Sequence, residues 1–173
     1  KDFSNFIKSI YQFSEEIGIY ADLQLRNIDY STSGSTSNIE ELAVNKKYSF
    51  FNPKAGLNYK MNAKNQIYFS LSRAFREPTR SDFENNLNIQ PEELIDYELG
   101  WKYNNNKFYF NSNLYYMNYK NQLVLTGALD DVGTPIRENS GKSYRTGIEL
   151  DSMYKATHCL EISTNLSYSQ SKN

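Results

Sequence analysis

Residues Leu94–Tyr103 have the sequence LIDYELGWKY, in which apolar and polar side chains alternate. Successive side chains of a β-strand point to opposite faces of its sheet. One face of this stretch carries Ile95, Tyr97, Leu99, Trp101 and Tyr103, and the other carries Asp96, Glu98, Gly100 and Lys102. No charge interrupts the apolar face. The stretch is therefore predicted to be a strand with one apolar and one polar surface.

The same two-residue period recurs along the chain and predicts an all-β protein of about eight strands. Helical periodicity is nearly absent, and a helical turn is expected only at Ser81–Asn86 or Pro91–Leu94. Arg73 is an exception to the alternation, because it falls on the apolar face of its strand. The expected strands are Asn5–Phe13, Ile17–Tyr30, Phe50–Met61, Gln66–Phe75, Leu94–Tyr103, Lys107–Leu125, Ser143–Tyr154 and Leu160–Ser169.

The connections between these strands alternate in length. Short polar turns alternate with long links at Ser31–Lys47, Arg76–Glu93 and Thr126–Lys142, which are expected to be loops. An antiparallel up-and-down meander with short turns at one end and long loops at the other is typical of an outer-membrane barrel. A Greek-key sandwich does not require this pattern.

Composition excludes several classes of protein. The 173 residues carry a formal net charge of -1, which argues against binding to nucleic acid. The aromatic share of 15% argues against disorder, and no run of about 18 apolar residues predicts a membrane-spanning helix. The sequence contains one cysteine, no clustered metal ligands and no nucleophile beside a base, so neither a metal centre, a catalytic site nor a cofactor is predicted.

Periodicity alone leaves a soluble β-sandwich and a membrane barrel open, because the two differ only in which face is buried. Glycines on the polar face favour the barrel. Gly18, Gly56, Gly100 and Gly147 all lie on that face, where a solvent-exposed strand gains nothing from glycine. In a crowded barrel interior, by contrast, a residue without a side chain is favourable.

Several motifs resemble the barrel signature of TonB-dependent outer-membrane receptors. The resemblance runs through FNPKAGL at Phe51–Leu57, YFSLSRAFREPT at Tyr68–Thr79, PEE at Pro91–Glu93 with DYELG at Asp96–Gly100, and NLYYMNYKNQL at Asn113–Leu123. It implies a 22-stranded barrel in the outer membrane of a Gram-negative bacterium, closed by an N-terminal plug and energised by the TonB complex. The cargo would be a siderophore, haem, cobalamin or glycan.

Residues 1–173 are accordingly expected to form part of such a barrel, without the plug domain or the TonB box. Both chain ends are expected in outer loops. The expected partners are outer-membrane lipid, the remainder of the barrel, the plug and, through it, the TonB complex. Two alternatives stay open: a small self-contained eight-stranded anchor or adhesin, and a soluble Tyr-rich β-sandwich that binds carbohydrate.

The polar face and the loop ends supply the candidate functional residues. A salt-bridge mesh is expected to line the lumen, and aromatics near the short turns are expected to mark the membrane interface. Arg76 and Arg80 are candidates for binding an anionic ligand, the alternative being structural pairs with Glu77, Asp82 or Glu84. The lumen residues are Lys54, Asp96, Glu98, Lys102, Arg145 and Glu149, and the interface aromatics are Tyr59, Trp101, Tyr103 and Tyr154.

Overall fold

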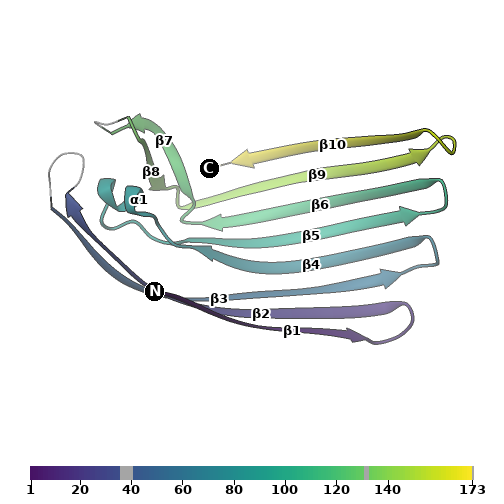
Figure 1. Cartoon of the computed structure of the whole chain (residues 1–173), viewed down its shortest axis with the longest axis horizontal. Coiled ribbons are helices and arrows are strands. Elements are labelled where there is room, and N and C mark those ends of the chain that lie inside the picture. The colour runs from purple at the N-terminus through teal and green to yellow at the C-terminus, as the bar shows by residue number, and fades with distance from the viewer. Residues whose placement is uncertain (36–40, 131–132, 173) are drawn as a thin grey trace.

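A computed structural model describes residues 1–35, 41–130 and 133–172. Eight strands form one antiparallel sheet in the order β1-β2-β3-β4-β5-β6-β9-β10, and β7 and β8 form a separate two-stranded ribbon (Figure 1). The strands are β1 (Asp2–Gln12), β2 (Ile17–Ser35), β3 (Glu41–Lys60), β4 (Asn65–Arg76), β5 (Glu92–Asn104), β6 (Phe108–Lys120), β7 (Leu123–Leu129), β8 (Pro135–Asn139), β9 (Lys142–Lys155) and β10 (Glu161–Lys172); the helix α1 is Arg80–Asn85.

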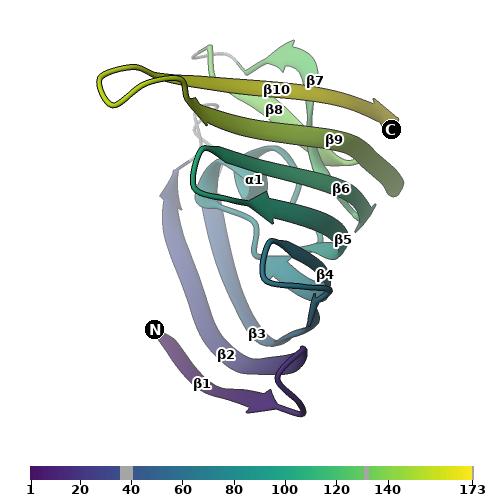
Figure 2. The same cartoon turned by 90° about the vertical axis from the view of Figure 1, so that its right-hand side faces the viewer.

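The eight strands form a single curved layer (Figure 2). The predicted apolar stripe is exposed on one face of it, with Leu57 at 42% and Leu99 at 48% of full exposure. A sandwich would bury these side chains against a second sheet, so the sandwich alternative is wrong. The edge strands β1 and β10 do not pair with each other, so this chain does not form a closed eight-stranded barrel either. The all-β meander is confirmed.

Short turns lie at one end of the sheet, and α1 and the β7–β8 ribbon lie at the other (Figure 1). Both chain ends lie on the side of α1 and the ribbon. No helix in the described part of the chain is long and apolar enough to cross a membrane. The end with the short turns is called the turn end below, and the other is called the loop end.

Tyrosine rings explain three of the glycines on the polar face. Tyr20 is the register partner of Gly56, and Tyr68 is the register partner of Gly100. A Cβ atom on Gly56 would lie 2.3 Å from the Tyr20 ring, and one on Gly100 would lie 2.0 Å from the Tyr68 ring. A Cβ atom on Gly147 would lie 2.5 Å from the backbone oxygen of Tyr168 and 2.6 Å from the hydroxyl oxygen of Tyr115. These glycines let the rings lie flat on the neighbouring strand, which the crowded polar face requires.

The loop end differs from the expectation in two of the three links. β2 and β3 continue as a paired ribbon to Ser35 and from Glu41, where a loop from Ser31 to Lys47 was expected. Residues 36–40 of that link lie outside the described residues. The expected strand Lys107–Leu125 is interrupted after Lys120, where Asn121 has a φ of 55°. The chain then turns away from the sheet as β7 and returns as β8 inside the third link.

The second link contains the helix. The alternative at Ser81–Asn86 is confirmed by α1, whereas Pro91–Leu94 leads directly into β5. Thr79 is the N-cap residue, and Asp82 accepts hydrogen bonds from the Thr79 backbone N–H and hydroxyl at 2.8 Å each. This capping contact satisfies a donor that the first helical turn leaves free.

A small hydrophobic cluster holds α1 against the β2–β3 ribbon. Phe83 is fully buried in it, and its ring lies 5.5 Å from that of Tyr30. The cluster consists of Leu42, Val44, Phe83, Ile89 and Leu123, with Tyr30 packed against it. Strand alternation puts Tyr30, Leu42 and Val44 on the same face as the polar side chains nearer the turn end. The polar face of the sheet therefore becomes apolar at the loop end, where α1 covers it.

Candidate functional site

A row of charged side chains crosses the polar face at one level. The strand registers connect Lys8 with Asp22, Asp22 with Lys54, Lys54 with Ser72, Ser72 with Asp96, Asp96 with Met117, and Met117 with Arg145. The sign of the charge alternates along the row. The predicted lumen residues Lys54, Asp96 and Arg145 belong to it, and Glu98, Lys102 and Glu149 lie on the same face.

The expected salt-bridge mesh is not present as direct ion pairs between the predicted lumen residues. Among the six predicted lumen residues, all of which the structure describes, no ion pair forms. Ser72 separates Lys54 from Asp96, and Met117 separates Asp96 from Arg145. Strands lie about 4.8 Å apart, so Asp96 is about 10 Å from both Lys54 and Arg145. Asp22 is the register partner of Lys54 on the adjacent strand, but the two described side chains form no ion pair. Lys54, Asp96 and Arg145 thus face the space inside the curved sheet without a partner of opposite charge in contact.

Neutral groups satisfy part of this face instead. The Ser70 hydroxyl donates to a Glu98 carboxylate oxygen at 2.7 Å, and Lys102 Nζ lies 4.9 Å from the centre of the Tyr68 ring. Side-chain hydrogen bonds also link the strands, among them Asn52 to Gln24, Gln66 to Asn58, and Tyr68 to Asn113. The resulting surface is hydrogen-bonded and mixed in charge.

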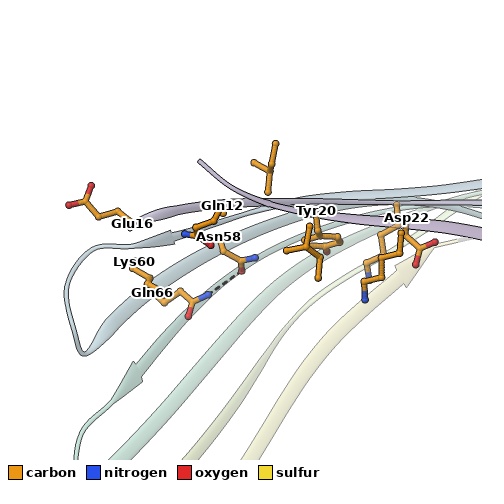
Figure 3. A pocket seen from close by; sticks show the side chains of 12 residues that line it. Gln12, Glu16, Tyr20, Asp22, Asn58, Lys60 and Gln66 are labelled. Atoms are coloured by element: carbon orange, nitrogen blue, oxygen red, sulfur yellow. Dashed lines mark hydrogen bonds between the residues drawn. The ribbon is translucent and has the colours of Figure 1, made fainter. Parts of the chain in front are cut away.

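Near the turn end the polar face is hollowed. Side chains from β1 to β4 line a hollow of about 590 Å³, open on one side (Figure 3). Gln66 donates a hydrogen bond to Asn58 at 3.1 Å within the lining, which also includes Tyr20, Asp22 and Lys60 (Figure 3). The lining brings together no nucleophile with a neighbouring base among the described residues. The hollow is suited to contact with another polar surface.

The two arginines proposed for ligand binding lie in different surroundings. Arg80 forms a 2.7 Å ion pair with Glu84 and donates to Thr32 Oγ1 at 3.0 Å and to the carbonyl oxygen of Ser33 at 3.1 Å. It thereby ties α1 to the end of β2, which agrees with the structural alternative. Arg76 is exposed at the end of β4, and within the described ranges it forms no ion pair.

A third arginine was missed by the sequence interpretation. Arg26 bridges two carboxylates, Asp2 at 2.7 Å and Glu77 at 2.8 Å, and so joins β1 and β2 to the link after β4. Its hydrogen bonds lower the pKa of Asp2, and the two carboxylates raise the pKa of Arg26. Arg26 and Glu77 are 51 positions apart, and no local sequence signal connects them.

Aromatic side chains mark both ends of the exposed apolar face. At the turn end, the predicted residues Tyr59, Trp101 and Tyr154 are each at least 40% exposed, and Trp101 contacts the ring of Tyr103. A second row at the loop end was not predicted. In it the ring centres of Tyr97 and Tyr116 lie 6.3 Å apart, and those of Tyr116 and Tyr144 lie 5.9 Å apart. Two aromatic rows that border an exposed apolar face are typical of a membrane-spanning sheet.

Comparison with protein families decides the class. The model described as "TonB dependent receptor-like, beta-barrel" matches residues 6–173. The chain belongs to this family. Members of the TonB-dependent receptor family are outer-membrane transport proteins. The exposed apolar face, the glycines on the polar face and the alternation of short turns and long links all fit a barrel of this family. A comparison with curated protein sequences found no match.

Solved structures share the fold. The FrpB iron transporter from Neisseria meningitidis is 19% identical, with a TM-score of 0.71 over 99% of this chain and 26% of its own. The copper transporter OprC is 15% identical, with a TM-score of 0.86 over 99% of this chain and 29% of its own. The siderophore receptor PirA from Pseudomonas aeruginosa is 17% identical, with a TM-score of 0.75 over 98% and 32%. The chain thus spans about a quarter to a third of these receptors.

Proposed function

We propose that the chain forms the wall and part of the extracellular rim of an active transporter in the outer membrane of a Gram-negative bacterium. The transporter imports a scarce nutrient with energy delivered by the TonB complex. In this proposal the exposed apolar face contacts lipid, the polar face lines the lumen, and the loop end lies outside the cell. One observation carries it: a single curved sheet with an exposed apolar face matches the family model over residues 6–173.

The proposal explains the two unpaired edge strands and the charged row on the polar face. β1 and β10 keep one side free for pairing with the remaining strands of a larger barrel. The unpaired charges of the row through Lys54, Asp96 and Arg145 are costly beside an apolar medium and stable beside a polar one. A hydrated plug domain inside the barrel supplies such surroundings, and the plug is also the proposed route to the TonB complex.

The proposed cargo is a metal complex or another polar nutrient, namely a siderophore, haem, cobalamin or glycan. Support comes from the names of the structural neighbours, which are transporters of iron and copper and a siderophore receptor. The polar wall also suits a cargo that carries charge or many hydrogen-bonding groups. The proposed role is transport without catalysis, and it involves no nucleic acid.

Growth under limitation tests the proposal. Cells that express the complete receptor, cells that lack it, and cells that express it without TonB are compared on iron-limited medium. Each culture receives one source at a time: ferrichrome, ferric enterobactin, haem or a spent-medium siderophore extract, with cyanocobalamin or a glycan tested as the limiting nutrient in parallel. Growth on at least one source that needs both the receptor and TonB is expected. A receptor that supports equal growth with and without TonB on every source contradicts the proposal.

A further inference from the structure

A second, smaller hollow opens on the polar face at the turn end, beside the one shown in Figure 3. It has a volume of about 400 Å³ and shares Lys60 and Gln66 with the first hollow. Lys60 on β3 and Lys102 on β5 are both register partners of Gln66, so the two lysines stand on either side of it on the same face. Lys64, in the turn between β3 and β4, is the third lysine of the lining. The name lysine hollow is used below for this site.

The lysine hollow holds positive charge without a counter-charge. Its lining contains no carboxylate among the described residues. The three lysines form no ion pair with any residue in the described parts of the chain. Asp151 is separated from Lys102 by Asn111 and so lies about 10 Å away. Glu16 belongs to the neighbouring turn, where its carbonyl oxygen, rather than its carboxylate, accepts a hydrogen bond from the Lys60 backbone at 2.8 Å.

The turn that carries Lys64 is fixed by hydrogen bonds. Asn62 Oδ1 accepts from the backbone N–H groups of Lys64 at 2.9 Å and of Asn65 at 3.0 Å, and Asn65 Oδ1 accepts from Trp101 Nε1 at 3.1 Å. The backbone N–H of Asn104 donates to the carbonyl oxygen of Lys64 at 2.9 Å, which ties the turn to the end of β5. The amide oxygens of the turn are thus occupied, whereas each lysine ammonium supplies three donors and no acceptor. The turn therefore presents Lys64 to the hollow from a fixed backbone.

The charge and size of the lysine hollow select a class of ligand. Three like charges around one hollow repel one another, and a bound anion offsets that repulsion. The backbones of Lys60 and Lys102 are about 10 Å apart, and each lysine carries its charge on a flexible four-carbon stem. Such a pair can close on a ligand that has two or more carboxylates several bonds apart. The volume lies within the usual range of small-molecule sites, which is about 300–1,000 Å³.

From these features we propose that the lysine hollow binds a small polycarboxylate as it leaves the lumen. The hollow lies on the polar face at the turn end, which in the proposed orientation is the periplasmic mouth of the barrel and the last part of this wall that a cargo passes. The role in cargo release rests on the proposed function, because only then does the turn end face the periplasm. The inference narrows the cargo to compounds with several carboxylate groups, among them the metal chelates of such compounds.

Lysine acetylation in the complete receptor tests the inference. Lys60, Lys64 and Lys102 are exposed, so the reagent reaches them, and mass spectrometry measures the rate at each one in nanodiscs. The probe is citrate, and triethyl citrate, which has the same skeleton without the charge, serves as the comparison. Citrate at ten times its Kd occupies about nine-tenths of the site and is expected to slow acetylation of all three lysines about tenfold. Triethyl citrate is expected to leave the rates unchanged.

Two double variants show whether the positive charge binds the probe. Lys60→Gln with Lys102→Gln is expected to raise the citrate concentration that protects Lys64 about 30-fold, which is the product of two ion pairs in water. Lys60→Arg with Lys102→Arg is expected to keep the protection of Lys64, because it keeps both charges.

The matched control is Lys107→Gln with Lys155→Gln, which removes the same charge from the same end of the sheet, outside the lysine hollow. Acetylation that citrate does not slow overturns the inference, and so does an equal loss of protection in the control. Lysines that resist acetylation before citrate is added overturn it as well, because the plug then already fills the hollow.

The acetylation measurement needs neither TonB nor uptake, so it fails separately from the proposed function. A receptor whose lysine hollow binds citrate but which supports no TonB-dependent growth counts against the proposed function and leaves the site standing. TonB-dependent growth without protection by citrate overturns the site alone.

Discussion

The lower and upper halves of the β2–β3 hairpin have the same backbone pairing and opposite burial. In the lower half, Leu57 and its neighbours on the same face are exposed, while the other face carries polar residues such as Lys54. In the upper half, the polar face turns apolar and Leu42 is only 2% exposed. The lower half behaves as a sheet with lipid outside, and the upper half behaves as a sheet of a soluble protein with its own core.

The difference shows that the burial pattern of one strand can change along its length, from that of a strand beside lipid to that of a strand beside water. Lipid accepts apolar side chains on the outside, so no core is needed below the loop end. In the proposed orientation, water surrounds the hairpin above the membrane, and apolar side chains are stable there only where another element covers them. The helix α1 and the start of β7 provide that cover through Phe83 and Leu123. Four experiments test this difference between the two halves and the contacts that accompany it.

The largest effect is expected for Phe83→Ala, because this side chain is fully buried. Removing a buried phenylalanine usually costs about 3–5 kcal/mol. The loss is expected locally, as release of α1 from the hairpin, and appears as faster amide hydrogen exchange in β2 and β3 above Ile28. The exposed Leu87 in the same link is the control, and Leu87→Ala is expected to leave exchange unchanged. Equal exchange in both variants contradicts a core at the loop end.

The next largest effect is expected for a charge on the exposed apolar face. Ala55→Arg places a charge at the middle of the exposed apolar face and is expected to lower the free energy of unfolding by about 2–4 kcal/mol in bilayers. Ser49→Arg, on the same strand and face but above the membrane, is expected to change it by less than about 0.5 kcal/mol. Urea unfolding of the complete receptor in lipid vesicles measures both. Similar costs for the two variants rule out a lipid border between these positions.

A smaller effect is expected for the tyrosine rings on the polar face. Gly100→Ala places a methyl group 2.0 Å from the Tyr68 ring. Such overpacking usually costs about 1–3 kcal/mol. The second change Tyr68→Ala removes the ring, so the cost of adding the methyl is expected to fall close to zero in that background. A cost of Gly100→Ala that is the same with and without the ring contradicts the proposed packing.

The smallest effect concerns the Arg26 bridge. The pKa of Asp2 is lowered from its usual 3.8 by the hydrogen bond and charge of Arg26. A lowered carboxyl pKa stabilises the fold fully above the unfolded value and loses this contribution as pH falls through the folded value. Acidification below about pH 4 is therefore expected to loosen β1 more in the parent receptor than in Asp2→Asn. Hydrogen exchange of β1 at pH 3 and pH 6 makes the comparison, and identical pH dependence in both proteins argues against the bridge.

The half of the sheet nearer the turn end could be predicted because its strands and faces depend on residues that are close together in the sequence. Leu94–Tyr103 alternates strictly, the turns are short and polar, and the glycines lie on one face, so strands, faces and aromatic border at the turn end follow from neighbouring residues. The upper half could not be predicted in this way. Tyr30 and Leu42 are buried because Phe83 covers them, and Phe83 is about 40 or more positions distant from either.

The candidate site shows the same division. Its polar face follows from alternation, so the positions of Asp96 and Arg145 were predictable. Their contacts depend on the register between strands, which put the neutral residue Met117 between them where an ion pair was expected. The structural role of Arg80 depends on where α1 lies against the end of β2. Side-chain partners across strands are a tertiary property, and no pattern within one strand specifies them.

A cysteine scan along β3 shows where lipid and water meet the strand. Each position from Leu42 to Tyr59 is replaced by a spin-labelled cysteine in the complete receptor, with Cys159→Ser as background, and its collisions with oxygen and with a water-soluble nickel complex are measured in bilayers. The account predicts that Phe51, Leu57 and the other odd positions between them meet oxygen and not nickel. Above Phe50, odd positions should meet nickel, and the buried positions Leu42 and Val44 should meet neither. A single unbroken alternation from Leu42 to Tyr59 would contradict a change from lipid to water near Phe50.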